Sequence, residues 1–181
     1  MSRLVKPVSS RDHVLGSANA RAEIVEYLDY ECPYCKLANG VVAELLRRFA
    51  GDVRYAARHF PLTRMHPHSL LAAQAAEAAG AQGSYWQMHE MLFANQDALE
   101  LEDILRYADA LDLDVRQVAQ ELADETHVPK VQSDFDSGIR SGVNGTPTFF
   151  ADGLRVDGGW DLESLSAAIE NARSASPGAR Y

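Results

Sequence analysis

The chain has 181 residues, of which 46% are hydrophobic and 24% are charged. That balance is typical of a soluble globular protein, and it excludes a disordered chain and a small scaffold held together by disulfides. Acidic residues outnumber basic ones by 26 to 17, and the net charge of −9 disfavours binding to nucleic acid or to anionic lipid. The length fits one domain, or one domain with a large insertion.

The first predicted strand covers residues 23–30, which are rich in β-branched and aromatic side chains. Residues 1–21 before it are polar and irregular. A helix is expected over residues 32–49, followed by a second strand over residues 53–60. Apolar residues recur at helical spacing in this helix and are expected to form its buried stripe: Leu37, Val41, Leu45 and Phe49.

The middle of the chain carries helical periodicity. The expected helices cover residues 66–81, 84–95, 101–111, 115–122 and 128–141. A strand is expected again at residues 148–151, and the Asp152-Gly153 pair predicts a tight hairpin to a last strand over residues 154–156. Asp161 is expected to cap a final helix, and the tail from Ser174 is expected to fray. This order predicts one α/β sheet with an inserted helical lid.

Neither a secretory signal nor a membrane span is expected. The N-terminus lacks the apolar run of a signal peptide, and no later segment approaches the roughly 18 apolar residues of a membrane span. The expected compartment is therefore the cytoplasm, and the expected state is a monomer that binds neither membrane nor nucleic acid. A signal peptide cleaved before residue 1 would change the expected compartment.

The chain has two cysteines, Cys32 and Cys35, at the junction of the first predicted strand and helix. In a reducing compartment, such a close pair is typical of chemistry rather than of structural crosslinking. In the first helical turn, Cys32 lies next to unpaired backbone N–H groups and the positive end of the helix dipole, which stabilise its thiolate. Cys35 follows by one turn, near enough to resolve a mixed disulfide, and Pro33 suits the first turn because it lacks an N–H.

Two other interpretations of the pair remain open at this point: an accidental pair and half of a zinc site. Zinc needs four ligands, and the chain has no second cysteine pair, so His59, His66 or His68 would have to complete the site. Redox chemistry is the better interpretation. No metal ligand is assigned.

Four stretches of the chain carry a combination of motifs that is more specific than any one of them. They are, in chain order, EYLDYECPYC at residues 26–35, HFPL, HP and AAQAAEAA between residues 59 and 79, GSYWQMHEMLF at residues 83–93, and GTPTF at residues 145–149. This combination resembles the DsbA-like thioredoxin-fold oxidoreductases. Their corresponding stretches form the active-site strand and helix start, the entry into a helical insert, its second helix and the cis-proline loop. The resemblance extends from Ala22 to about Ala172.

The resemblance implies an α/β fold of the thioredoxin type, with a central mixed sheet and a large helical insertion. It divides the chain into an N-terminal segment (1–21), a thioredoxin-like domain (22–62 and 144–173) and an inserted helical subdomain (63–143).

The resemblance also implies that the Thr146–Pro147 bond is cis and faces the dithiol. A cis bond would leave the Thr146 backbone free to pair with an extended substrate segment. On spacing alone, a trans proline that starts the following strand is an equally good interpretation. The expected substrate-binding residues are Thr146, Pro147, Pro33 and Tyr34.

Glu26, six residues before Cys32, is the third expected catalytic residue, since thioredoxin-fold proteins often keep a buried acid beneath the resolving cysteine. A buried carboxylate is costly unless it is paired or functional. Burial would raise its pKa and suit it to accept the Cys35 proton. The alternative is a surface acid on a strand edge. Asp29 and Glu31 would disfavour the Cys32 thiolate, so the expected drop in its pKa is moderate.

The leading functional prediction is an enzyme that exchanges thiols and disulfides with protein substrates, with Cys32 as nucleophile and Cys35 as resolving thiol. The implied redox group is the Cys32–Cys35 disulfide, with no other cofactor. The expected partners are thiol- or disulfide-containing proteins and an unidentified electron donor or acceptor. The direction of electron flow depends on the relative stability of thiolate and disulfide, and the sequence leaves it open.

One alternative is a glutathione-dependent enzyme of the glutaredoxin, transferase or isomerase type, with glutathione as co-substrate. The Pro33-Tyr34 dipeptide favours it, as do residues 158–161, which resemble a glutathione carboxylate site at a helix N-terminus. The chain length and the helical insert count against it. The other alternative is a non-catalytic, chaperone-like binding module with a vestigial dithiol.

Overall fold

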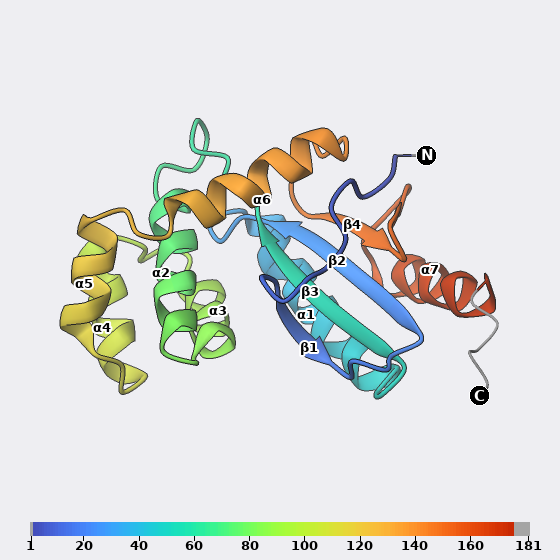
Figure 1. Cartoon of the computed structure of the whole chain (residues 1–181), viewed down its shortest axis with the longest axis horizontal. Helices are drawn as coiled ribbons and strands as arrows, with labels where there is room; N and C mark the ends of the chain where they lie inside the picture. Colours follow the sequence, from blue (N-terminus) through green and yellow to red (C-terminus); the bar gives the residue numbers. More distant parts are fainter. Residues whose placement is uncertain (1, 176–181) are drawn as a thin grey trace.

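A mixed sheet of five strands forms the centre of the computed structural model, which describes residues 2–175 (Figure 1). The strands are β1 (His13–Gly16), β2 (Ala22–Leu28), β3 (Val53–His59), β4 (Thr148–Ala151) and β5 (Leu154–Arg155). Their spatial order is β1-β3-β2-β4-β5, with β2 and β3 parallel and the other neighbours antiparallel. Because β2 and β3 are parallel, both carboxyl ends meet at one edge of the sheet, where the dithiol follows β2.

The N-terminal segment contributes a strand that the sequence analysis missed. β1 pairs antiparallel with the outer edge of β3, although residues 1–21 were expected to be irregular. The segment is held by Arg58, a fully buried side chain whose Nε donates to Asp12 at 2.7 Å and whose Nη1 donates to the Lys6 carbonyl at 2.7 Å. The strand is short and only half-buried, so its composition gives little strand signal.

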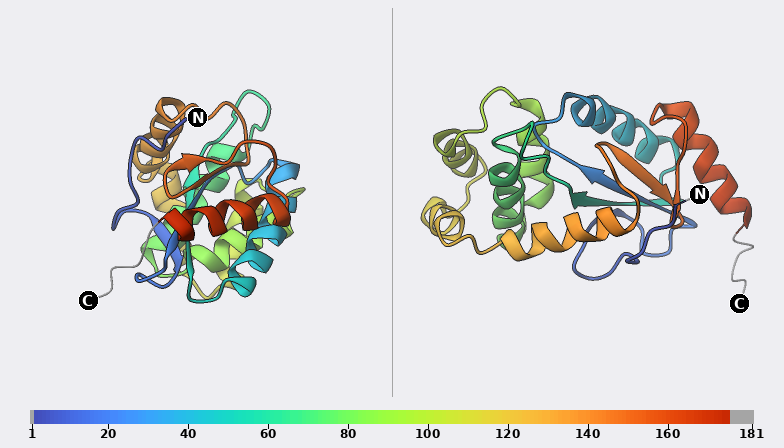
Figure 2. Two further views of the ribbon diagram at one scale, coloured as in Figure 1. Left: turned by 90° about the vertical axis from the view of Figure 1, so that its right-hand side faces the viewer. Right: turned by 90° about the horizontal axis from the view of Figure 1, so that it is seen from above.

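Helices cover both faces of the sheet (Figure 2). Their bounds are α1 (Pro33–Arg48), α2 (Ser69–Ala81), α3 (Tyr85–Ala94), α4 (Leu101–Ala110), α5 (Val115–Ala123), α6 (Val128–Arg140) and α7 (Leu162–Ala175). α1 and α7 lie on one face and α6 on the other, while α2 to α5 gather at one end of the sheet. None of the helices within residues 2–175 combines the length and the apolar character needed to cross a membrane.

The predicted helices are present, with small shifts at their ends. α2 begins at Ser69, three residues later than expected, because the residue before Pro67 is disfavoured in helical conformation. Asp152 and Gly153 both have positive φ, as the predicted tight hairpin requires, and β5 ends at Arg155, one residue early. Asp161 caps α7 by accepting from the Ser164 N–H at 2.9 Å.

The tail was expected to fray from Ser174. Instead, Ser174 and Ala175 belong to α7. The remainder of the tail, residues 176–181, lies outside the described residues.

β2 directs alternate side chains to the two faces of the sheet. Ile24 and Leu28 lie in the cluster formed with α1 and α7, whereas Val25 and Tyr27 lie in the cluster beneath α6. α6 approaches the sheet closely at Gly138, where an added Cβ would come within 3.0 Å of the rings of Phe60 and Tyr27. The alternation places Glu26 on the same face as α1.

The buried stripe of α1 differs from the predicted one. Leu37 is 61% exposed, and the fully or nearly buried positions are Cys35, Ala38, Val42 and Leu45. The buried stripe starts at Cys35, and the residues that follow it at intervals of about one helical turn face the sheet. Leu45 and Phe49 fit both patterns, so apolar spacing alone placed the first half of the stripe on the wrong side.

Candidate active site

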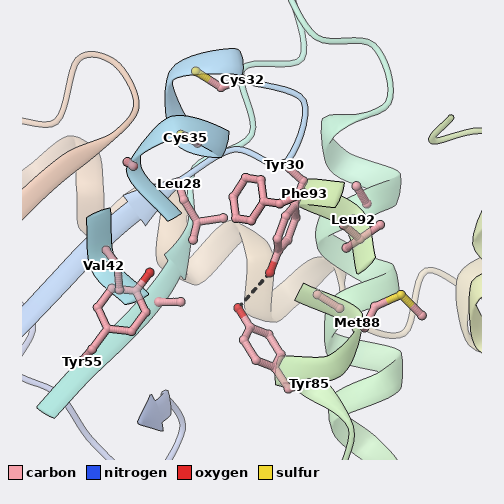
Figure 3. Close-up of a cluster of buried hydrophobic side chains, with 14 of the residues drawn as sticks. Leu28, Tyr30, Cys32, Cys35, Val42, Tyr55, Tyr85, Met88, Leu92 and Phe93 are labelled. Carbon is pink, nitrogen blue, oxygen red and sulfur yellow. Dashed lines mark hydrogen bonds between the residues drawn. The ribbon is translucent and has the colours of Figure 1, made fainter. Parts of the chain in front are cut away.

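The dithiol lies where β2 leads into α1. Cys32 is the N-cap of α1, with extended backbone (φ −75°, ψ 120°), and Pro33 is the first helical residue. Figure 3 shows Cys32 at the start of the helix and Cys35 one turn further along. Both are free thiols, and Cys32 is 4% exposed against 0% for Cys35. Cys32 is thus the more accessible sulfur, though less exposed than a surface nucleophile.

The surroundings of Cys32 favour its thiolate. A hydrogen bond from the Cys35 thiol is the largest effect, and together with the Thr146 side chain and the backbone N–H groups of Tyr34 and Cys35 it outweighs burial. The pKa of Cys32 is lowered from 9.0 to about 5 as a result. Apart from Thr146, these donors belong to the first turn of α1, where N–H groups lack helical partners.

The loop before β4 brings Thr146 and Pro147 to the dithiol. The bond between them is cis, and the Cys32 Sγ lies 3.4 Å from the Thr146 carbonyl oxygen. The buried Thr146 Oγ1 has no hydrogen-bond partner within the described part of the chain, which leaves it free to donate to a Cys32 thiolate. Beside the loop, an open cavity of about 350 Å³ is lined by Tyr34, Thr146, Pro147, Arg155 and Trp160, among others.

The four predicted substrate-binding residues therefore lie around one sulfur. Pro33 and Tyr34 are exposed on the first turn of α1, with Tyr34 at 61%. Thr146 and Pro147 face them from the loop before β4, and Tyr34 and the loop share the cavity.

Glu26 is buried beneath the helix, not on a strand edge. It is 1% exposed, and desolvation raises its pKa from 4.5 to about 8, against a hydrogen bond from Tyr55 that lowers it. Burial likewise raises the pKa of Cys35, and the hydrogen bond to Cys32 and the Glu26 charge raise it further. The two groups thus lie in one buried region that keeps both of them protonated near neutral pH in the dithiol form.

Asp29 and Glu31 do not have the expected effect on Cys32. The Asp29 carboxylate accepts from the N–H groups of Glu31 and Leu62 and contacts His66, at 2.8 to 2.9 Å. Glu31 accepts from the His68 N–H at 2.7 Å and contacts its ring at 3.0 Å. Neither carboxylate is among the groups that chiefly set the Cys32 pKa, which falls to about 5, so the expectation of a moderate drop was wrong.

The histidines considered for a zinc site each face a carboxylate. His66 contacts Asp29 and His68 contacts Glu31, while His59 contacts Glu77 at 2.8 Å. His59, Glu77 and Asp134 do form a compact buried group. However, the Lys130 ammonium lies 2.5 Å from Asp134 and 3.6 Å from Glu77, so it supplies the positive charge that a metal ion would otherwise provide.

Two residues at the site were missed by sequence reasoning. Tyr55 on β3 donates to Glu26 Oε2 at 2.6 Å. Gln96, just after α3, donates through one amide nitrogen to the carbonyls of Tyr30 at 2.6 Å and Cys32 at 2.9 Å. The β2–β3 register could have suggested Tyr55, but the sequence carries no signal for Gln96.

The fold agrees with the comparisons with known proteins. A family model described as thioredoxin matches residues 9–171, nearly the whole described chain. The chain belongs to the thioredoxin family. The predicted fold, a thioredoxin-like mixed sheet with a large helical insertion, is confirmed.

Solved structures of DsbA-like proteins share this fold. Oxidised BdbD from Bacillus subtilis has 25% sequence identity and a TM-score of 0.85, with 96% of this chain and 98% of that chain covered. A thioredoxin-like oxidoreductase from Silicibacter pomeroyi has 29% identity and a TM-score of 0.79, with 92% and 94% covered. α-DsbA1 from Wolbachia pipientis has 22% identity and a TM-score of 0.81, with 96% of each chain covered.

The curated relatives with high identity are much longer proteins. The Na⁺/H⁺ antiporter NhaA 3 of Salinispora tropica is 48% identical over 170 residues, and NhaA 1 of Salinispora arenicola is 47% identical over the same length. Each match covers 93% of this chain but 26% of the relative. The chain thus spans about a quarter of the length of these relatives, and their names describe the longer proteins.

Proposed function

We propose that this protein is a thiol:disulfide oxidoreductase that exchanges disulfides with protein substrates through Cys32 and Cys35. The observation that carries the proposal is the difference between two thiols one helical turn apart. The pKa of Cys32 falls to about 5, whereas burial raises that of Cys35. A low-pKa thiolate next to a buried, protonated thiol supports the division into nucleophile and resolving group.

The exchange proceeds through one mixed disulfide. When the protein acts as reductant, the Cys32 thiolate attacks a substrate disulfide, forms an Sγ–S bond and releases one substrate thiolate. Cys35 then gives its proton to Glu26 and attacks Cys32 Sγ, which forms the Cys32–Cys35 disulfide and releases the second substrate thiolate. The released thiolates take protons from solvent. Oxidation of a substrate dithiol follows the same steps in reverse.

The stabilised Cys32 thiolate favours the oxidising direction. A group that stabilises the thiolate stabilises the reduced dithiol, and this raises the reduction potential of the couple. We therefore propose that the protein transfers disulfides to its substrates. Equilibration with glutathione redox buffers tests the direction: a potential above that of the glutathione couple supports the oxidant, and a potential well below it refutes the oxidising role while leaving exchange intact.

Protein substrates fit the site better than glutathione does. The cavity beside Thr146 and Pro147 is open, and it accommodates an extended segment paired with the Thr146 backbone. The expected glutathione carboxylate site precedes α7, where the Asp161 carboxylate already accepts from the N–H and hydroxyl groups of Ser164, at 2.9 and 2.8 Å. A second carboxylate there would meet a like charge.

The test uses a disulfide-containing protein such as insulin and follows turnover together with trapped intermediates. Cys32→Ser is expected to abolish turnover, and Cys35→Ser to accumulate mixed disulfides at Cys32 that a reductant releases. If Cys32→Ser traps substrate and Cys35→Ser does not, the roles of the two thiols are reversed. If the wild type turns over glutathione disulfide but no protein disulfide, the substrate class is wrong.

A further inference from the structure

One hydrogen bond links the buried acid to the neighbouring strand. Glu26 on β2 and Tyr55 on β3 belong to paired parallel strands, and the Tyr55 hydroxyl donates to Glu26 Oε2 at 2.6 Å. Tyr55 is 1% exposed, and in Figure 3 it lies beneath α1 beside Val42. Glu26 Oε1, also buried, has no hydrogen-bond partner among residues 2–175. One carboxylate oxygen is therefore held and the other is free.

We propose that Tyr55 is a positioning residue: its hydroxyl fixes Glu26 through Oε2, stabilises the ionised carboxylate, and leaves Oε1 as the atom that takes the Cys35 proton. This inference rests on the proposed role of Glu26 as proton acceptor. Tyr55 itself transfers no proton, because burial and the Glu26 charge hold its pKa well above 10. It acts as a fixed donor throughout the reaction.

The physical need for such a donor follows from burial. A carboxylate removed from water is disfavoured in its charged form, and an acid that stays protonated cannot accept a proton from Cys35. A phenol donor compensates part of that cost, since a hydrogen bond to a charged group is stronger than one between neutral groups. It brings no opposite charge, so the carboxylate remains basic enough to act near neutral pH.

Few other titratable groups influence Glu26. Besides Tyr55 on β3, they are the thiols of Cys32 and Cys35 on α1 and the phenol of Tyr30 in the segment between β2 and α1. β4 pairs with β2 at this point through Phe149, which carries no charge, and α7 contributes apolar side chains to the same cluster. In the mixed disulfide, the Cys32 sulfur is uncharged, which removes one repulsion and lowers the Glu26 pKa from its value of about 8 in the dithiol.

The experiment measures the rate at which Cys35 resolves a mixed disulfide of Cys32 with a cysteine-containing peptide, from about pH 5 to about pH 10. The wild-type rate is expected to rise with pH through the Glu26 midpoint. Tyr55→Phe is expected to move this midpoint upward by about one pH unit, which corresponds to about tenfold slower resolution below the midpoint. 3-Fluorotyrosine at position 55, a stronger donor of nearly the same shape, is expected to move the midpoint downward.

Tyr85→Phe is the matched control, because Tyr85 is equally buried and bonds to Tyr30, not to Glu26. It is expected to leave the midpoint unchanged. A slower Tyr55→Phe enzyme with an unshifted midpoint assigns Tyr55 to packing alone and overturns the inference. A fluorotyrosine protein with the wild-type midpoint also overturns the inference. This second measurement decides the question even if the Tyr55→Phe variant fails to fold.

Glu26→Gln tests the proposed role of Glu26 as proton acceptor separately from the inference about Tyr55. If Glu26→Gln leaves the pH profile unchanged, Glu26 is not the acceptor and the proposed relay fails. If it removes the pH-dependent rise in the rate, Glu26 is the proton acceptor, and the Tyr55→Phe and fluorotyrosine profiles then decide the role of Tyr55. Adding Tyr55→Phe to Glu26→Gln is then expected to change the rate no further, whereas a further tenfold loss would show that Tyr55 acts by another route.

Discussion

Replacing Cys35 with alanine should make Cys32 less acidic. The Cys35 thiol gives the largest single stabilisation of the Cys32 thiolate, whose pKa is about 5. A hydrogen bond to a charged group contributes about 1.5–3 kcal/mol, which corresponds to about one to two pKa units. Cys35→Ala is therefore expected to raise the Cys32 pKa to between about 6 and 7. Cys35→Ser keeps a donor at the same position and should stay nearer to the wild-type value.

The sign of the effect on stability follows from the lowered pKa. The thiolate form stabilises the folded, reduced protein fully above the unfolded pKa of about 9, and this stabilisation is lost as the pH falls through about 5. At pH 7 it amounts to two pKa units, or about 3 kcal/mol. Cys35→Ala is expected to remove about half of it at pH 7 if the Cys32 pKa rises to about 6, most of it if the pKa rises to about 7, and almost none of it at pH 4.

The assay is the rate of iodoacetamide alkylation of Cys32 against pH, supported by the ultraviolet absorbance of the thiolate. In both Cys35 variants, Cys32 is the one remaining cysteine, so the signal is unambiguous. Equal midpoints for Cys35→Ala and Cys35→Ser would refute the reasoning, because the variants differ chiefly in the donor. A wild-type midpoint above about 8 would refute the stabilised thiolate itself.

Two further predictions concern stability, measured by urea unfolding. Gln96→Leu should lower the free energy of unfolding by about 1–3 kcal/mol, because the backbone carbonyls of Tyr30 and Cys32 lose their donor. The control is Gln87→Leu, at an exposed position on α3. Equal losses of unfolding free energy in the two variants would contradict the role of Gln96. Glu77→Gln should lower the free energy of unfolding by about 3 kcal/mol at pH 7, because the buried Glu77 carboxylate pairs with His13 and His59 and the substitution removes its charge. Those histidines hold the pKa of Glu77 far below 4.5, so its contribution is present above pH 4.5 and declines at lower pH; a cost that grows in acid would contradict this sign.

The local sequence pattern was sufficient to predict most of the helices and strands of the fold. β2, α1 and β3 carry strong strand and helix signals on both sides of the dithiol, and they lie within a few residues of their predicted bounds. β1 was missed because it is an edge strand whose pairing depends on the distant Arg58–Asp12 contact. Leu37 was misplaced because the orientation of α1 is decided by tertiary packing.

The site was predictable in part for similar reasons. The order of Cys32 and Cys35 along the helix follows from chain position, and Glu26 was expected beneath them. The partner of Glu26 depends on the register between two strands that are distant in sequence, so Tyr55 was not predicted. The Asp29 carboxylate accepts a hydrogen bond from a backbone N–H of the loop after β3, and the amino-acid sequence carries no signal for that contact.

The contacts between α3 and α1 limit how the protein can be shortened. Gln96 donates to the Cys32 carbonyl, and His89 on α3 bonds to Asn39 on α1 at 3.1 Å and to the Tyr30 hydroxyl at 3.0 Å. A minimal protein made by deleting the segment between β3 and β4 would lose these donors and uncover the buried Tyr30 ring. A designer who transplants the dithiol into a smaller scaffold must therefore supply replacements for two side chains from outside the thioredoxin-like core, Gln96 and His89, and not only the four-residue motif.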